Sequence, residues 1–273
     1  MRALSVVIPA LNERENIAQV LASVPVERLR EHGWSTEIVV VDNGSTDGTG
    51  ELARDLGASV VLEPNRGYGN AYKAGFRYAT GDVIATGDAD LTYPLDRLPE
   101  LLETLDSRGV EFMTTNRLLR SNREAMKASH SVGNHLLSVI SRRLFRHGFR
   151  DSQSGMWIFQ RSVWARLDVR SAGMAFSQEI KNEAHRRGIQ CHEISIEYRP
   201  RGGTVKLNAF RDGWQNLRQL IEHRTRALAP LAPAPPAVRA EVCSPVSGGI
   251  DLRDSASRDL GPAPREVLTP VDE

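Results

Sequence analysis

The sequence is poor in cysteine and has no long run of apolar residues. Its 273 residues include two cysteines, Cys191 and Cys243, which form neither a zinc-binding spacing nor a disulfide framework. A reducing compartment, the cytosol, fits this composition best. No stretch reaches the roughly 20 consecutive apolar residues that a membrane-spanning helix requires, so any membrane contact is expected to be peripheral.

A strong excess of one charge is also absent. The formal net charge is +1, with 35 Lys and Arg against 34 Asp and Glu. This balance by itself argues neither for nor against a nucleic-acid partner. No motif indicates such a partner, and none is expected.

The C-terminal residues differ in composition from the rest of the chain. Residues 228–273 contain four Lys or Arg and seven Asp or Glu, and eight of the 14 prolines lie after Ala229. Such a segment cannot bury enough apolar surface to offset its chain entropy. We therefore predict one folded domain over residues 1–227 and a disordered, acidic tail rich in Pro and Ala over 228–273.

Short apolar segments alternate with helical patterns along the predicted domain. The expected strands are 4–9, 37–42, 59–63, 82–86, 111–115, 156–160 and 190–198. The expected helices are 15–23, 49–56, 68–79, 95–107, 131–146, 177–187 and 209–226. This alternation is typical of βαβ units. The predicted fold class is therefore α/β, with a mostly parallel central sheet flanked by helices.

Ligands of open α/β sheets bind at the carboxyl ends of the strands, so the residues after each strand are candidate contacts. The second expected strand ends at Asp42, ahead of a glycine turn, where a carboxylate can bond a base or ribose. Helix capping is the alternative, which we favour for Asp47. Residues 67–71 weakly resemble a dinucleotide fingerprint, but Tyr72 stands where the third glycine belongs, so a dehydrogenase is not expected.

The most informative stretch follows the fourth expected strand, where Gly87 precedes Asp88 and Asp90. Residues two apart in an extended chain point the same way, so both carboxylates can face one cation. Mg²⁺ or Mn²⁺ suits such hard ligands and would offset the charge of a leaving diphosphate. A polar turn with two solvated aspartates is the alternative. The polar ends of the neighbouring strands favour the metal.

Taken together and in order, these motifs resemble the inverting GT-A glycosyltransferases of family 2, most closely the polyprenyl-phosphate (dolichol-phosphate) mannose or glucose synthases. The matching segments are 7–16, 41–49, 65–70, 87–91, 116–117, 151–155 and 198–201, with Lys206. The resemblance covers residues 4 to about 215 and implies the GT-A nucleotide-diphospho-sugar transferase fold.

The resemblance also implies roles for the matching residues. The base and ribose pocket would be lined by Pro9, Leu11, Glu13 and Asp42. The metal and the diphosphate would be bound by Asp88 and Asp90. A mobile loop closing on phosphates would carry Arg199, Arg201 and Lys206. Candidate catalytic residues are Asp90, Arg117, which would approach the donor or acceptor phosphates, and Glu179, which stands where many relatives have a catalytic acidic pair.

One position departs from the family pattern. Close relatives often carry Gln two residues after the second aspartate, as a further metal contact, whereas this chain has Thr92. The resemblance therefore does not extend to the whole metal shell.

The predicted reaction transfers a hexose, with inversion, from a GDP-mannose or UDP-glucose type donor to a polyprenyl phosphate. A phosphate acceptor needs mainly alignment and charge neutralisation. Residues 117–150 supply cations, with eight Lys or Arg against one acidic residue, Glu124. The expected helices 131–146 and 209–226 are basic and amphipathic, and such helices can lie on an anionic membrane. Packing on the sheet with a solvated basic face is the alternative.

Three other functions remain open. A soluble hydroxyl acceptor, in cell-envelope glycan or natural-product biosynthesis, would require a general base such as Glu179. A sugar-phosphate nucleotidyltransferase would need a Gly-rich basic loop after the first strand, where residues 9–16 differ. A non-catalytic module that binds nucleotide sugars would not depend on Asp88 and Asp90 for its function.

Overall fold

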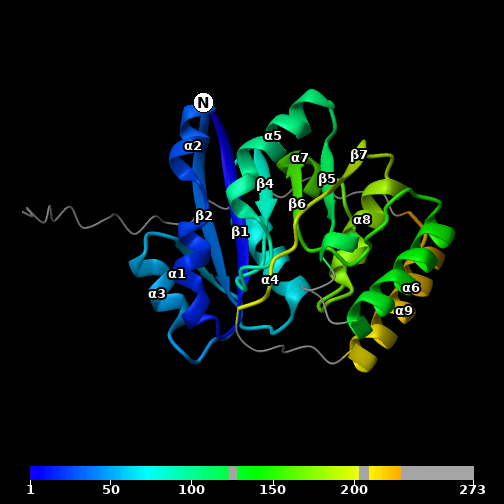
Figure 1. Cartoon of the computed structure of the whole chain (residues 1–273). Helices are drawn as coiled ribbons and strands as arrows, with labels where there is room; N and C mark the ends of the chain where they lie inside the picture. The colour runs from blue at the N-terminus through cyan, green and yellow to red at the C-terminus, as the bar shows by residue number, and fades with distance from the viewer. Residues whose placement is uncertain (123–127, 203–208, 229–273) are drawn as a thin grey trace, which may run out of the picture. The chain divides into compact units, whose positions relative to one another are not determined.

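The computed structural model describes residues 1–122, 128–202 and 209–228. The predicted contact Lys206 and all of the predicted tail except Leu228 lie outside these residues. The described chain forms a central sheet with helices on both faces (Figure 1). The predicted α/β class is confirmed.

The sheet has seven strands in the order β3-β2-β1-β4-β6-β5-β7. The strands are β1 (Arg2–Ala10), β2 (Trp34–Asp42), β3 (Ser59–Leu62), β4 (Val83–Thr86), β5 (Phe112–Asn116), β6 (Trp157–Gln160) and β7 (Cys191–Ser195). All neighbours are parallel except β6, which is antiparallel to both β4 and β5. Each expected strand is present, and the sheet is mostly parallel as predicted.

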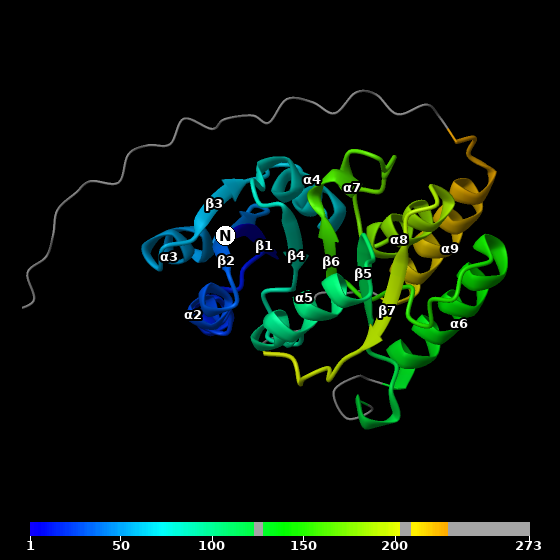
Figure 2. The same ribbon diagram turned by 90° about the horizontal axis from the view of Figure 1, so that it is seen from above.

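Helices cover the two faces of the sheet in separate groups (Figure 2). One face packs on α1 (Arg14–Ala22), α2 (Val26–Glu31), α3 (Thr49–Asp55) and α5 (Leu98–Ser107). The other packs on α4 (Tyr68–Tyr78), α7 (Arg161–Trp164) and α8 (Phe176–Arg186). Alternation within β1 explains how it serves both layers, because Val6 and Ile8 enter one core and Val7 the other.

Two longer helices, α6 (Ala128–Phe145) and α9 (Ala209–Thr225), lie side by side against α8 (Figure 2). A small apolar cluster, Leu137, Phe145 and Leu220, joins them. Their attachment to α8 is largely polar: the Gln178 side chain donates to Gln219 Oε1 at 2.8 Å, and His223 Nε2 lies 2.8 Å from Glu183.

Four large apolar side chains on these two helices remain exposed: Val132, Leu136, Trp214 and Ile221. Both helices therefore pack on each other and on α8, where packing on the sheet had been the expected alternative to membrane contact, and they still present apolar surface. Among the described residues, no helix combines the length and the apolar character needed to cross a bilayer.

The sequence analysis did not predict the short helices and turns of the fold. The helices α2 and α7 contain six and four residues. Two 3₁₀ turns, Leu95–Arg97 and Arg120–Asn122, also interrupt the expected pattern, the first at the start of the helix expected from residue 95.

Two helical glycines should respond oppositely to substitution by alanine. A Cβ on Gly69 would overlap the Ser171 carbonyl oxygen and lie 2.9 Å from Phe176 Cβ. The Gly69→Ala variant should therefore lose about 1–3 kcal/mol of unfolding free energy. Gly133 in α6 is exposed with open space around it, so Gly133→Ala should gain about 0.5–1 kcal/mol. Urea unfolding measures both, and equal effects would contradict this description of the α4 packing.

Candidate active site

A cavity of about 260 Å³ lies at the carboxyl ends of β1 and β4. Strand order reverses between these two strands, which is where open α/β sheets bind ligands. The lining residues come from the ends of β1, β2 and β4, the start of α4, and two later segments: Pro9, Ala10, Leu11, Glu13, Asn43, Gly67, Tyr68, Ala71, Asp88, Ala89, Asp90, Met174 and Arg201.

Asp88 is held by tyrosine hydroxyls from α4. The Tyr68 hydroxyl donates to Asp88 Oδ1 at 2.9 Å, and the Tyr72 hydroxyl donates to the same oxygen at 3.3 Å. Burial, and then the charge of Asp90, raise the pKa of Asp88 to about 7, although the Tyr68 hydrogen bond opposes the shift. Two carboxylates placed so close need a cation if both are to be ionised.

Asp90 is buried and oriented by its own turn. Its Oδ1 accepts the Thr92 hydroxyl at 2.6 Å and the Thr92 backbone N–H at 3.2 Å. Its Oδ2 lies 3.1 Å from Arg201 Nη1. Thr92, the departure from the family pattern, thus fixes the carboxylate of Asp90.

The segment after β7 crosses to this cavity, and Figure 1 shows it as a yellow trace running to the lower ends of β1 and β4. The Arg199 backbone N–H donates to the Thr92 carbonyl at 3.0 Å, and the Gly202 N–H donates to the Asp90 carbonyl at 2.9 Å. These bonds place the Arg201 guanidinium between Asp90 and Glu13, the latter at 3.8 Å.

The residues present fit a divalent cation. Arg201 already supplies positive charge beside Asp90 and Glu13, which shows that this end of the cavity favours a cation. No group of three or more His, Cys, Asp or Glu side chains among the described residues could hold a metal by itself. Asp88 and Asp90 could therefore supply part of a shell that phosphate oxygens and water would complete, as Mg²⁺ commonly has.

Six of the residues predicted from the sequence line the cavity: Pro9, Leu11, Glu13, Asp88, Asp90 and Arg201. Asp42 does not line it. Its Oδ1 accepts the Ser45 N–H at 2.8 Å, so the carboxylate shapes the turn that leads into α3. The next residue, Asn43, faces the cavity and also accepts the Gly67 N–H at 2.7 Å. A contact between Asp42 and a nucleotide remains a prediction.

Glu179 has structural partners away from the cavity lining. It is buried at the first turn of α8, where it accepts the N–H groups of Arg170 and Ser171 at 3.2 and 2.7 Å. Its other oxygen lies 2.9 Å from Arg226. The segment that it holds abuts the start of α4, because the Ala172 carbonyl accepts the Asn70 N–H. Glu179 thus positions a loop, and its role as a catalytic residue stays a prediction.

Arg117 is buried behind the cavity. Its Nε and Nη2 donate to the two carboxylate oxygens of Asp151 at 2.8 and 3.1 Å, and its guanidinium lies 5.2 Å from the Tyr198 ring centroid. Burial raises the pKa of Asp151, but the charge and hydrogen bonds of Arg117, together with the charge of Lys181, outweigh burial and keep the pKa below its usual value. Arg117 is therefore placed to act on Asp88 through its charge, which also lowers the pKa of that carboxyl.

Arg199 forms a two-pronged ion pair with Asp96 at 2.7 and 3.0 Å and does not line the cavity. Its predicted phosphate contact would require this pair to open.

The sequence did not predict the tyrosines of the site. Besides Tyr68 and Tyr72, these include Tyr93, whose hydroxyl accepts the Gly155 N–H at 2.6 Å. The spacing of four between Tyr68 and Tyr72 on one helix was the available signal.

Comparison with known proteins identifies the family. The family model described as glycosyl transferase family 2 matches residues 5–167. A low-salt glycan biosynthesis hexosyltransferase of Haloferax volcanii is 38% identical over 225 residues, which are 80% of this chain and 53% of that protein. The chain thus spans about half the length of this relative. A dolichyl-phosphate hexose transferase of the same organism is 31% identical over 210 residues, with 77% and 89% of the two chains covered.

A solved structure shares the fold. Glucosyl-3-phosphoglycerate synthase from Mycobacterium tuberculosis, in complex with Mn²⁺, UDP-glucose and phosphoglyceric acid, has a TM-score of 0.65 at 22% identity. The match covers 82% of this chain and 80% of that one. The predicted GT-A fold is thereby confirmed, and the chain belongs to glycosyl transferase family 2.

Proposed function

We propose that this family 2 glycosyltransferase transfers a hexose from a nucleotide-diphosphate sugar of the GDP-mannose or UDP-glucose type to a polyprenyl phosphate, with inversion. The observation that carries the proposal is the cavity at the switch point of the sheet, where Asp88 and Asp90 face Arg201. The family assignment and the names of its relatives support it.

The two ends of the cavity can bind different parts of the nucleotide-sugar donor. Residues at the end of β1, Pro9 and Leu11, with Asn43 beside them, offer an apolar wall and an amide for the base and ribose. Asp88 and Asp90 would hold Mg²⁺ or Mn²⁺ at the diphosphate, where the ion supplies charge neutralisation for the leaving group. The complex of the mycobacterial enzyme with Mn²⁺ and UDP-glucose supports this arrangement.

The lining favours an acceptor that is already anionic. Its carboxylates among the described residues are Glu13, Asp88 and Asp90, of which the last two are assigned to the metal. Glu13 lies beside Arg201, and Glu179 is engaged elsewhere. A hydroxyl acceptor would need a base that this wall does not offer. A phosphate oxygen can attack the anomeric carbon directly while the bond from that carbon to the diphosphate breaks, and no proton has to move.

Peripheral contact with a membrane fits the same proposal. The exposed apolar side chains of α6 and α9, with Arg143 and Arg218 on the same two helices, would suit the surface of a bilayer that carries the lipid acceptor. Co-sedimentation with anionic vesicles tests this contact, and recovery of all protein in the supernatant would contradict it.

Product analysis tests the acceptor. The protein is incubated with radiolabelled GDP-mannose or UDP-glucose, Mn²⁺ and either undecaprenyl phosphate, dolichyl phosphate or soluble glycosides. We expect label in the organic extract only when a lipid phosphate is present. Label transferred to a soluble glycoside but never to lipid would replace the proposal by the hydroxyl-acceptor reaction.

Substitution of the carboxylates should abolish transfer without unfolding the protein. Asp88→Asn and Asp90→Asn keep the side-chain shape but remove a metal ligand, so kcat should fall by about two to three orders of magnitude. Calorimetry should show that Mn²⁺ no longer strengthens donor binding. Asp106→Asn, at an exposed ion pair with Arg2, is the matched control and should keep full activity. Unchanged activity in the two site variants would indicate a non-catalytic binding module.

Arg201 should compete with the metal for Asp90. In Arg201→Ala, removal of a positive charge 3.1 Å from the carboxylate should raise the affinity for Mn²⁺ alone by about tenfold or more, while nucleoside diphosphate binds more weakly. Arg199→Ala is the matched control, because its guanidinium pairs with Asp96 outside the lining and should not affect Mn²⁺. Titration calorimetry with Mn²⁺ measures both variants. Equal Mn²⁺ affinity in Arg201→Ala and the parent would contradict the competition.

A further inference from the structure

The last strand of the sheet, β7, has an unpaired edge. Its one neighbour among the described residues is β5, to which it runs parallel. An unpaired edge offers a row of N–H and C=O groups to another extended chain. Such edges in native proteins are commonly covered or blunted, so an accessible one invites a partner strand.

The register shows which groups of β7 are free. The Phe112 N–H donates to the Gln190 carbonyl at 3.1 Å, and the Ile196 N–H donates to the Asn116 carbonyl at 3.2 Å. Alternate residues of a parallel strand bond to the same neighbour, so the backbone groups of even-numbered residues face β5. The N–H and C=O groups of Cys191, Glu193 and Ser195 therefore point away from the sheet. Within the described chain, these backbone groups have no hydrogen-bond partner.

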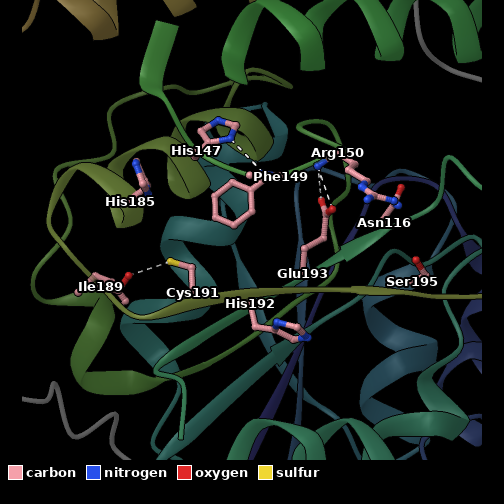
Figure 3. Close-up of a pocket in the computed structure, with 11 residues that line it drawn as sticks. Asn116, His147, Phe149, Arg150, His185, Ile189, Cys191, His192, Glu193 and Ser195 are labelled. Atoms are coloured by element: carbon pink, nitrogen blue, oxygen red, sulfur yellow. Dashed lines mark hydrogen bonds between the residues drawn. The ribbon is translucent and has the colours of Figure 1, made fainter. Parts of the chain in front are cut away.

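A cavity of about 410 Å³ lies along this edge (Figure 3). All three outward-facing residues of β7 line it, and residues 147–150 form another part of its wall. This segment is tied to β7 through a side chain and not through a backbone ladder: the Glu193 carboxylate accepts the N–H groups of Arg150 and Asp151 at 2.8 and 3.0 Å. The unpaired edge of β7 therefore borders a cavity that is already formed in the structure. We call this cavity the slot.

The charged and polar side chains that line the slot indicate which kind of ligand it can bind. Arg150 lines it, and the hydrogen bonds found for this residue within the described chain come from its backbone N–H and not from its guanidinium. Glu193 already accepts two backbone N–H groups. His147 is engaged through both ring nitrogens, with Asn182 at 2.9 Å and the Phe149 N–H at 3.2 Å, and burial lowers its pKa to about 4, so its ring is neutral. Among the described lining residues, Arg150 therefore remains as the cation whose N–H donors are available to a ligand.

A second copy of this chain is a poorer fit than a different protein. Pairing of β7 with β7 about a twofold axis would place the same slot on both sides of the interface. Each partner would then bring an unpaired Arg150 and no free carboxylate to it. A segment with acidic side chains would meet that charge instead.

We propose that the free edge of β7 is a docking site for an extended acidic peptide segment of a partner protein, which adds a strand to the sheet. Backbone bonds to Cys191, Glu193 and Ser195 would hold the segment, and a carboxylate would pair with Arg150. This site lies outside the lining of the sugar-transfer cavity and does not depend on the proposed function.

Labelled peptides test the site. A fluorescein-labelled hexapeptide of alternating Val and Glu should bind the full chain saturably by fluorescence anisotropy, and the same peptide with Lys in place of Glu should not. Amide exchange should slow at Cys191, Glu193 and Ser195 in the complex. Equal binding of both peptides, or no saturable binding of the acidic one, would overturn the proposal.

Two variants separate the backbone and charge contributions. Ser195→Pro removes an N–H that faces away from β5, so the existing ladder is kept and the added strand is blocked; affinity should fall at least tenfold. Arg150→Glu should have a similar effect through charge. Arg54→Glu, exposed on α3 at the opposite end of the sheet, is the matched control.

Both slot variants should retain sugar transfer, which shows that they are folded. Unchanged peptide affinity in Ser195→Pro and Arg150→Glu would overturn the proposal. A dimer of the parent chain that Ser195→Pro dissociates, measured by light scattering, would also overturn it, because a second copy would then occupy the edge.

Discussion

The close approach of two carboxylates at the end of β4 is the constraint on which the site depends. Asp88 and Asp90 are partly and fully buried, and their mutual repulsion adds to burial in raising the pKa of Asp88 to about 7. Such a pair is tolerated because donors surround it: tyrosine hydroxyls at Asp88, Thr92 and Arg201 at Asp90. The same repulsion would favour a cation between the two carboxylates, so the feature that is costly to fold is the one proposed to bind the metal.

The sheet could be predicted from the sequence because its strands are apolar runs that are buried, at least in β1, β4 and β6, on both faces. Asp88 and Asp90 could be predicted because parallel strands bring their carboxyl ends to one edge. The helices α2 and α7 could not, since six and four residues show no helical period. Glu179 could not be placed either: its partners, the N–H groups of Arg170 and Ser171, belong to a loop whose path only the tertiary structure determines.

The position of Glu179 bears directly on chemistry. As a base in the cavity, it would have made a hydroxyl acceptor plausible. As a buried anchor for the 170–172 segment, it leaves three carboxylates in the described lining: Glu13, which lies beside Arg201, and Asp88 and Asp90, which are proposed to bind the metal. A nucleophile that carries its own negative charge is then the simpler chemical solution. The acceptor argument therefore rests on what the cavity lacks in these residues as much as on the relatives.

The loop Asp151–Gly155 lies between Asp88, a carboxylate of the candidate active site, and the polar interior around α8. On one side, the Tyr72 hydroxyl oxygen lies 3.3 Å from Asp88 Oδ1 and 3.3 Å from the Gly155 carbonyl oxygen, so it can donate its proton to either. On the other, buried Lys181 of α8 donates to the Asp151 carbonyl at 2.7 Å, and burial lowers the pKa of this lysine to about 7. Asp151 meanwhile holds Arg117. Hydrogen bonds and the charge of Arg117 thus connect Asp88 to α8 through this loop.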